Sequence, residues 1–199
     1  EGMPERTPEE IEAKQRRFQE AMQADAYRLN QVAAIPIAQF YIPKTTATKD
    51  QLITDATYRS YWTKGRQLLG PAPAMAWATA ERKRFFHWFI EFPEVMAAGG
   101  FDCILGNPPY LGGKKLSGSF GDGFLAYLGY EYAPIGAVDL VTYFLRRIYT
   151  LIRAGGFTSL ISTNTISQGR SREDGLQFII GNQHGSITHA VRSTRWPGQ

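Results

Sequence analysis

The fold of this chain is decided by a short apolar stretch that runs directly into a proline-rich turn, Phe101-Asp102-Cys103-Ile104-Leu105-Gly106-Asn107-Pro108-Pro109-Tyr110. The apolar part, 101–105, follows a small-residue loop and predicts a buried strand of a parallel sheet. Cys103 lies inside this strand and is interpreted as a buried small hydrophobic residue. Asp102 is either an orienting carboxylate or a cap where the loop meets the strand.

The sequence after this stretch alternates between helical and extended patterns. A strongly amphipathic helix is expected over Val138–Arg153, ended by Gly155-Gly156. The remaining expected elements are a strand over Phe157–Ser162, a helix over Arg172–Ile180 and a strand over Ser186–Val191. This alternation predicts an α/β fold in which the three strands belong to one parallel or mostly parallel sheet, covered on one face by the first helix.

The sequence before this stretch is organised differently. Residues 8–33 predict one amphipathic helix, with Thr7 as its N-cap and Pro8 at its first position. Residues 34–82 carry prolines and threonines without a clear period and are interpreted as an irregular connection with one short helix near Ala56–Leu69. The expected domains are therefore residues 1–82, an N-terminal helix and connection, and residues 83–199. The aromatic residues of the connection either pack it onto the body or contact nucleic acid; they are Tyr58, Tyr61 and Trp62.

Composition narrows the class of protein. The chain has 199 residues, one cysteine and a formal net charge of +4, which allows binding to a phosphate backbone without demanding it. One cysteine excludes an intrachain disulfide framework, and the three histidines lack metal-ligand spacing, so no metal site is expected. No apolar run is long enough for a membrane helix and no leader is recognisable, which favours a cytoplasmic location.

The turn at Asn107–Tyr110 carries the chemistry. The amine on a purine ring is a poor nucleophile because its lone pair is delocalised into the ring. The Asn107 side-chain oxygen and the Pro108 carbonyl can accept both amine hydrogens, which favours a pyramidal nitrogen with a free lone pair. Pro108 and Pro109 fix the backbone, which preorganises the two acceptors. Tyr110 offers a ring on which a flipped base can stack.

Asn-Pro-Pro-Tyr after a short apolar strand resembles motif IV of the amino methyltransferases. The surrounding sequence is similar to the large adenine methylases of restriction–modification and phage-defence systems, including the fused type II (type IIG, Eco57I-like) enzymes and BREX- or DISARM-like relatives. The resemblance covers motifs IV to VIII over residues 85–199 and is loose over residues 1–84. It rests on 88–95, 99–102, 106–110, Asp139-Leu140, 153–157, 163–169, 187–192 and 196–198.

The resemblance implies a partial Rossmann-like methyltransferase fold, the catalytic half of the sheet, with an N-terminal helical segment. It implies transfer of a methyl group from S-adenosylmethionine to N6 of a flipped adenine in double-stranded DNA. Asn107, Pro108, Pro109 and Tyr110 would be the catalytic residues, and Gly106 and Asn107 would face the cofactor. A methyltransferase acting on RNA or on a protein glutamine remains an alternative, as does a non-catalytic DNA-binding or assembly fragment of a methylase.

Other residues are candidates for substrate binding. Lys114 and Lys115 lie in a glycine-rich segment, 112–123, that is expected to be a mobile loop ordering on DNA; they either contact phosphates or form a solvated basic turn. Trp196 either covers the second face of the flipped base, opposite Tyr110, or packs the last strand. Gln168 lies in the segment that resembles the family after the second strand.

A glycine-rich cofactor turn after a first strand is not recognisable before residue 101, and Gly121-Asp122-Gly123 lacks a preceding apolar strand. In the order of the resembling family, the cofactor half would precede Glu1 and a target-recognition domain would follow Gln199. We therefore expect a piece of a longer polypeptide or a split subunit with companion defence subunits, inactive by itself.

Overall fold

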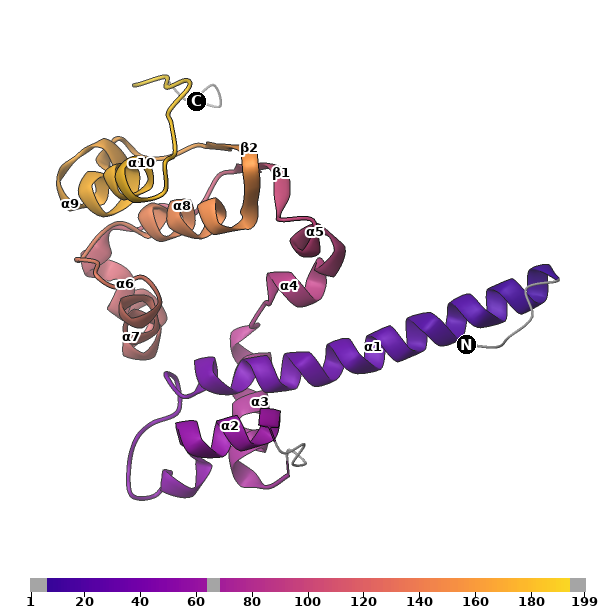
Figure 1. Ribbon diagram of the computed structural model, residues 1–199. Helices are drawn as coiled ribbons and strands as arrows, with labels where there is room; N and C mark the ends of the chain where they lie inside the picture. The colour runs from indigo at the N-terminus through magenta and orange to yellow at the C-terminus, as the bar shows by residue number, and fades with distance from the viewer. Residues whose placement is uncertain (1–6, 64–68, 194–199) are drawn as a thin grey trace, which may run out of the picture. The chain divides into compact units, whose positions relative to one another are not determined.

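The computed structural model describes residues 7–63 and 69–193 and divides the chain into two compact units, one through Phe92 and one from Pro93 (Figure 1). The sequence-based domain boundary at residues 82/83 remains a prediction. Within the described residues, no helix is both long enough and apolar enough to cross a bilayer.

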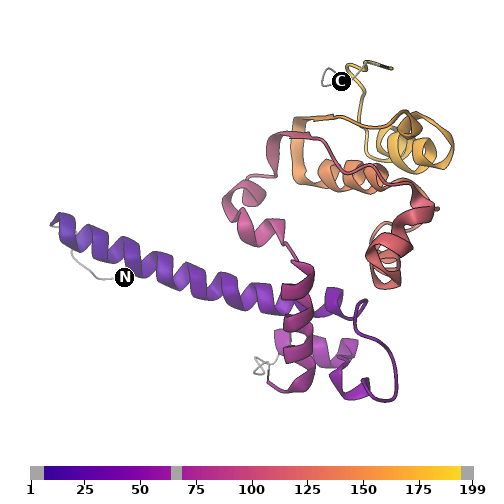
Figure 2. The same cartoon turned by 180° about the vertical axis from the view of Figure 1, so that it is seen from behind.

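The first unit is helical. Its elements are α1 (Pro8–Ala38), η1 (Lys49–Gln51), α2 (Asp55–Thr63), α3 (Pro71–Lys83) and α4 (Trp88–Glu91). Figure 2 shows α3 crossing the C-terminal part of α1, where Ile35, Ala38 and Ala76 are fully buried. The indole of Trp77 adds a polar tie, since its Nε1–H donates to the Gln31 carbonyl at 3.1 Å. The predicted first helix is confirmed and runs five residues further, through Pro36, because its last turn is buried against α3.

The reading of residues 34–82 as irregular, apart from one short helix, is wrong because it missed α3. Pro71 and Pro73 stand in the first turn of that helix, where backbone N–H groups need no helical partner, so they start the helix instead of breaking it. The alanine-rich sequence that follows has high helix propensity.

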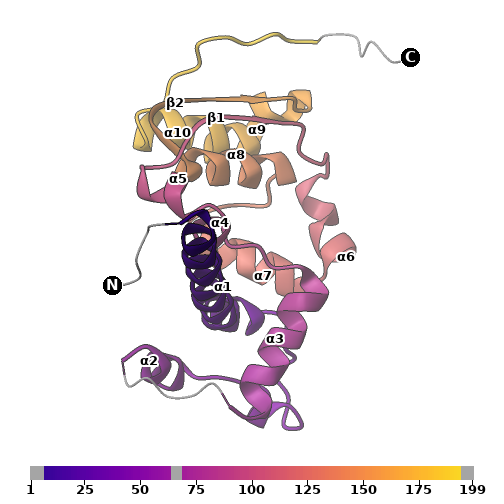
Figure 3. The same cartoon turned by 90° about the vertical axis from the view of Figure 1, so that its right-hand side faces the viewer.

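The second unit has the α/β character that the sequence predicts. In chain order its elements are α5 (Pro93–Ala97), β1 (Phe101–Gly106), η2 (Gly113–Lys115), α6 (Leu116–Phe120), α7 (Asp122–Glu131), α8 (Leu140–Leu151), β2 (Ile152–Leu160), η3 (Asn164–Ser167), α9 (Gly169–Ser171), the π-helical η4 (Arg172–Gln177) and α10 (Phe178–Asn182). β1 and β2 pair in parallel, from Phe101 opposite Ile152 to Gly106 opposite Leu160. Figure 3 shows both strands lying on the same side of α8.

The junction between α8 and β2 corrects the predicted helix end. The helix ends at Leu151, and Gly155-Gly156 lie inside β2, where the register against Phe101–Cys103 is irregular. Gly155 has φ of +74°, and a Cβ on Gly156 would lie 3.0 Å from the Phe101 carbonyl oxygen. The glycine pair therefore permits a strand irregularity and does not terminate the helix.

Three further expectations are wrong. Ser186–Val191 is not a strand: no ladder partner for it exists in the described part of the chain, and Val191 is 86% exposed. Cys103 is exposed because its side of the strand pair is uncovered. Residues 112–123 are mainly helical, because Leu116 of α6 is fully buried with Leu128 of α7.

The core of the second unit forms where α6 and α7 meet α8. Its buried residues are Leu116, Leu128, Val138, Leu140 and Tyr143. Beside it, the guanidinium of Arg146 donates to the Tyr132 carbonyl at 2.9 Å and lies 3.8 Å from the ring centre of Phe178. Burial lowers the pKa of Arg146, which the nearby carboxylate of Asp174 partly offsets. This cation ties α8 to the segment before it and to α10.

Candidate active site

The Asn-Pro-Pro-Tyr turn leaves the carboxyl end of β1. The Ile161 N–H, just beyond the end of β2, donates to the Gly106 carbonyl at 3.0 Å, so the two parallel strands finish at the same edge. In open α/β sheets ligands bind beyond this edge. The loops that follow β1 and β2 therefore both begin where a ligand is expected, and η3, α9 and Gln168 follow β2 on that side.

The turn presents polar atoms to solvent. Asn107 and Pro109 are exposed, Pro108 is buried, and Tyr110 is 49% exposed. The Tyr110 hydroxyl donates a hydrogen bond to the Asn107 side-chain oxygen. Among residues 7–63 and 69–193, no hydrogen bond reaches the Pro108 carbonyl oxygen. The turn therefore holds two acceptors, and the Asn107 oxygen already accepts one hydrogen bond from the turn's own tyrosine.

The far end of the turn is held by the start of α8. The Leu140 N–H donates to the Leu111 carbonyl at 2.9 Å, and the Gly113 N–H donates to Asp139 Oδ1 at 3.3 Å. From the sequence, Asp139 is notable only as part of the resemblance to the methylases. An aspartate near the start of an amphipathic helix indicates a helix cap, and nothing in the sequence indicates a contact with Gly113.

The other predicted residues are placed as follows. Lys114 and Lys115 are exposed on η2, directly after the anchored Gly113. Gln168 is exposed and precedes α9, with its backbone N–H bonded to the Thr165 carbonyl at 3.0 Å. Trp196 lies outside the described residues. No hydrogen bond among the described residues joins the lysines or Gln168 to the turn.

Asp102 is neither the orienting group nor the cap considered from the sequence. Its carboxylate accepts a hydrogen bond from Arg153 Nε at 2.5 Å, which joins β1 to β2. Both side chains are exposed, so this pair contributes little to stability.

The carboxyl edge of the strand pair presents a polar side chain, since Asn107 is exposed at the strand end. Packing favours glycine at position 106, because a Cβ there would lie 3.1 Å from Leu160 Cδ2. The described residues contain no glycine-rich turn directly after a strand, and within them no cluster of histidine, cysteine or carboxylate side chains could hold a metal ion.

A parallel strand pair backed by a helix, with a polar turn at its carboxyl edge, defines an α/β protein with a candidate ligand site at the strand ends. The family comparison specifies it further. Residues 7–190 match the model of a family described as Eco57I restriction-modification methylase, and the chain belongs to this family. No significant match was found among curated proteins or among solved structures. The chain is thus related to the methyltransferases of restriction–modification systems.

Proposed function

We propose that this protein is a site-specific DNA adenine-N6 methyltransferase that uses S-adenosylmethionine and serves a restriction–modification or phage-defence system. Membership of the Eco57I restriction-modification methylase family supports methyl transfer. The observation that carries the choice of an amine substrate is the pair of acceptors at the end of β1, the Asn107 side-chain oxygen and the Pro108 carbonyl. Both can accept hydrogens from one amine nitrogen.

The residues of the turn divide the work. Asn107 and Pro108 accept the two hydrogens of the adenine amine and so free its lone pair to attack. Pro109 keeps the turn rigid, and Tyr110 stacks on the flipped base, which is worth roughly 1–3 kcal/mol. When bound, S-adenosylmethionine supplies a methyl group on a sulfonium sulfur, and the sulfur keeps the electron pair of the broken bond as a neutral thioether. The amine then loses one proton to solvent.

Double-stranded DNA is the proposed partner. Lys114 and Lys115 are exposed immediately after the anchored end of the turn, which is suitable for contacts with phosphates beside a flipped base. In a plot of the logarithm of DNA affinity against the logarithm of salt concentration, each phosphate contact adds about 0.9 to the downward slope. Neutralising both lysines should lower this slope. An unchanged slope would assign them to a solvated turn.

The proposal is tested with the full-length protein, labelled S-adenosylmethionine and three substrates: duplex DNA, RNA and protein. Label is expected in DNA, with N6-methyladenine as the product. Asn107→Ala should reduce the rate by about 10²- to 10³-fold, the usual effect of removing a preorganised polar group, with little change in DNA affinity. Asn182→Ala, at the exposed end of α10, is the matched control. Label in RNA or in protein glutamine alone, or near-normal turnover by Asn107→Ala, would contradict the proposal.

A further inference from the structure

The segment after the Asn-Pro-Pro-Tyr turn is tied to α8 through one carboxylate. Asp139 Oδ1 accepts the Gly113 N–H at 3.3 Å, across 26 positions of sequence. Next to this contact, the Leu140 N–H donates to the Leu111 carbonyl at 2.9 Å. Two hydrogen bonds in parallel therefore hold Leu111–Gly113 against the first residues of the helix.

Asp139 does not use its side chain in the way expected of an aspartate before a helix. Such a residue usually accepts an N–H of its own first turn. Here its side chain makes no cap bond, and the Thr142 N–H is satisfied by the backbone carbonyl of Asp139 at 2.9 Å. The carboxylate is directed to Gly113 instead, which suggests that holding this segment is its main task.

The position of Asp139 is itself fixed. Its neighbours Val138 and Leu140 are 1% and 4% exposed in the core of the second unit. Its backbone N–H donates to Ser171 Oγ at 3.2 Å, and Ser171 of α9 is buried. The core and α9 therefore both hold the backbone from which the carboxylate reaches Gly113.

The fit around Gly113 is close. A Cβ on Gly113 would lie 2.5 Å from the Val138 carbonyl oxygen, so the loop backbone packs directly on the backbone before α8. The turn between is thereby held at both ends: by β1 at Gly106 and by the start of α8 at Leu111–Gly113. Only residues 107–110 span the interval.

We propose that Asp139 is a positioning residue that fixes the distal end of the Asn107–Tyr110 turn, so that the two amine acceptors keep their geometry during methyl transfer. This inference rests on the proposed function. Asp139 acts through the backbone of Gly113 and does not contact the reacting atoms. Methyl transfer depends on this kind of alignment, because a displacement of about 1 Å can slow catalysis by roughly 100-fold.

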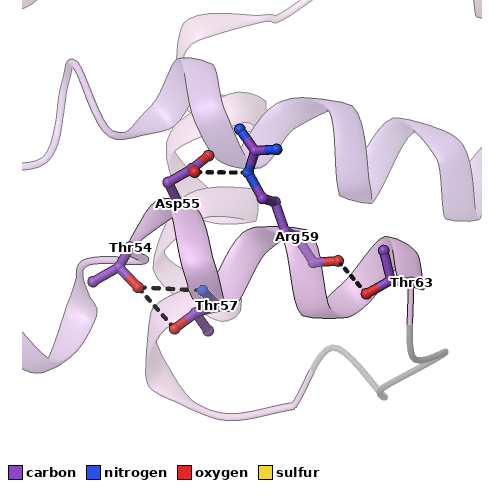
Figure 4. A network of polar contacts seen from close by, with 5 residues as sticks. All are labelled: Thr54, Asp55, Thr57, Arg59 and Thr63. Atoms are coloured by element: carbon purple, nitrogen blue, oxygen red, sulfur yellow. Dashed lines mark hydrogen bonds and ion pairs between the residues drawn. The ribbon is translucent and has the colours of Figure 1, made fainter.

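Two substitutions separate the possibilities in the full-length protein. Asp139→Asn keeps an oxygen that can accept the Gly113 N–H, whereas Asp139→Ala removes it. The matched control is Asp55→Ala, which also removes a bonded carboxylate at a helix start: Asp55 begins α2 and accepts a hydrogen bond from Arg59 Nε at 2.7 Å (Figure 4). Both side chains of that pair are exposed, and the pair is distant in sequence from the turn.

Four quantities are measured for each variant: kcat and KM for DNA methylation, hydrogen exchange of the peptide covering residues 107–115, and the thermal unfolding midpoint. Asp139→Ala should lower kcat by about 100-fold, leave KM for DNA nearly unchanged and speed exchange in this peptide. Asp139→Asn should restore most of kcat and of the protection. Asp55→Ala should change neither kcat nor the exchange of this peptide.

Other outcomes overturn the inference. Unchanged exchange and kcat in Asp139→Ala would do so, as would a loss of kcat no larger than the unfolded fraction explains. An equal loss of kcat and protection in Asp139→Asn would show that the hydrogen bond to Gly113 is not the basis of the effect. If the unsubstituted protein methylates no DNA, the proposed function fails separately, and the exchange comparison still decides whether Asp139 holds the turn.

Discussion

The hydroxyl of Tyr110 donates a hydrogen bond to the side-chain oxygen of Asn107, so two residues with separate proposed tasks are joined to each other in the free protein. The same Asn107 oxygen is the proposed acceptor for the target amine. We expect Tyr110 to leave this oxygen when a base enters, because its ring has to turn to cover the base. In the proposed complex the contact therefore competes with substrate.

This competition predicts different effects for two substitutions of Tyr110. Tyr110→Phe keeps the ring and removes the competing donor, so affinity for DNA with an extrahelical adenine should be unchanged or higher. Tyr110→Ala removes the ring and should weaken binding by about 1–3 kcal/mol. Fluorescence of 2-aminopurine at the target position reports both. Equal weakening by the two variants would contradict the competition.

Gly112 and Gly113 should differ sharply in their tolerance of alanine. A Cβ on Gly113 would lie 2.5 Å from a backbone oxygen, which must move, whereas one on Gly112 would lie 3.5 Å from Asp139 Oδ1, an ordinary contact. Gly113→Ala is expected to lower the free energy of unfolding by about 1–3 kcal/mol, and Gly112→Ala by much less. Urea denaturation measures both. Similar losses would show that the loop relaxes freely.

Arg146 and Arg147 offer a second matched pair. Arg146 donates to the Tyr132 carbonyl at 2.9 Å and lies over the ring of Phe178. A lysine has no planar group and cannot make both contacts. Arg147 makes a half-exposed ion pair with Glu131 at 3.7 Å. Arg146→Lys should destabilise by roughly 1–3 kcal/mol, and Arg147→Lys by less than about 0.5 kcal/mol. Thermal and urea unfolding should agree on this order, and a reversed order would contradict the packing.

Tyr132 should make the protein sensitive to alkali. Burial raises the pKa of its hydroxyl from 10.0 to about 12, with Arg147 opposing the shift. A raised pKa means that the unfolded chain ionises first, so stability is retained below about pH 10 and lost as pH rises towards about pH 12. Tyr132→Phe removes this ionisation and should flatten the fall of the unfolding midpoint over that range. An equally steep fall would place the cause in other groups.

The local signals in the sequence were reliable where one element depends on its own residues. The face expected of this helix holds Val141, Phe144, Leu145, Ile148 and Ile152. Val141, Leu145 and Ile148 are buried in α8, whereas Phe144 is 38% exposed and Ile152 begins β2. The prediction failed where glycine and proline have two possible uses. Pro71 starts a helix where the sequence predicts an irregular connection, and Gly155 lies in an irregular part of a strand where the sequence predicts a helix end.

The exposure of strand residues was also predicted wrongly, because it depends on which other elements cover them. Cys103 and Val191 have the side chains of buried strand residues, yet both are exposed in the described part of the chain. An apolar pattern states what a segment can bury. It does not state whether a neighbouring strand or helix is present to cover it.

The sequence alone determined the parallel strand pair, the amphipathic helix between the strands, and the turn Asn107–Tyr110 at the carboxyl end of the first strand. These follow from hydrophobic period and proline geometry, which involve residues close together in the chain. Only the tertiary structure decided that Tyr110 occupies the Asn107 oxygen and that Asp139 reaches Gly113. The choice of hydrogen-bond partner depends on which groups the packed core brings within about 3 Å, and side-chain type and spacing do not specify that.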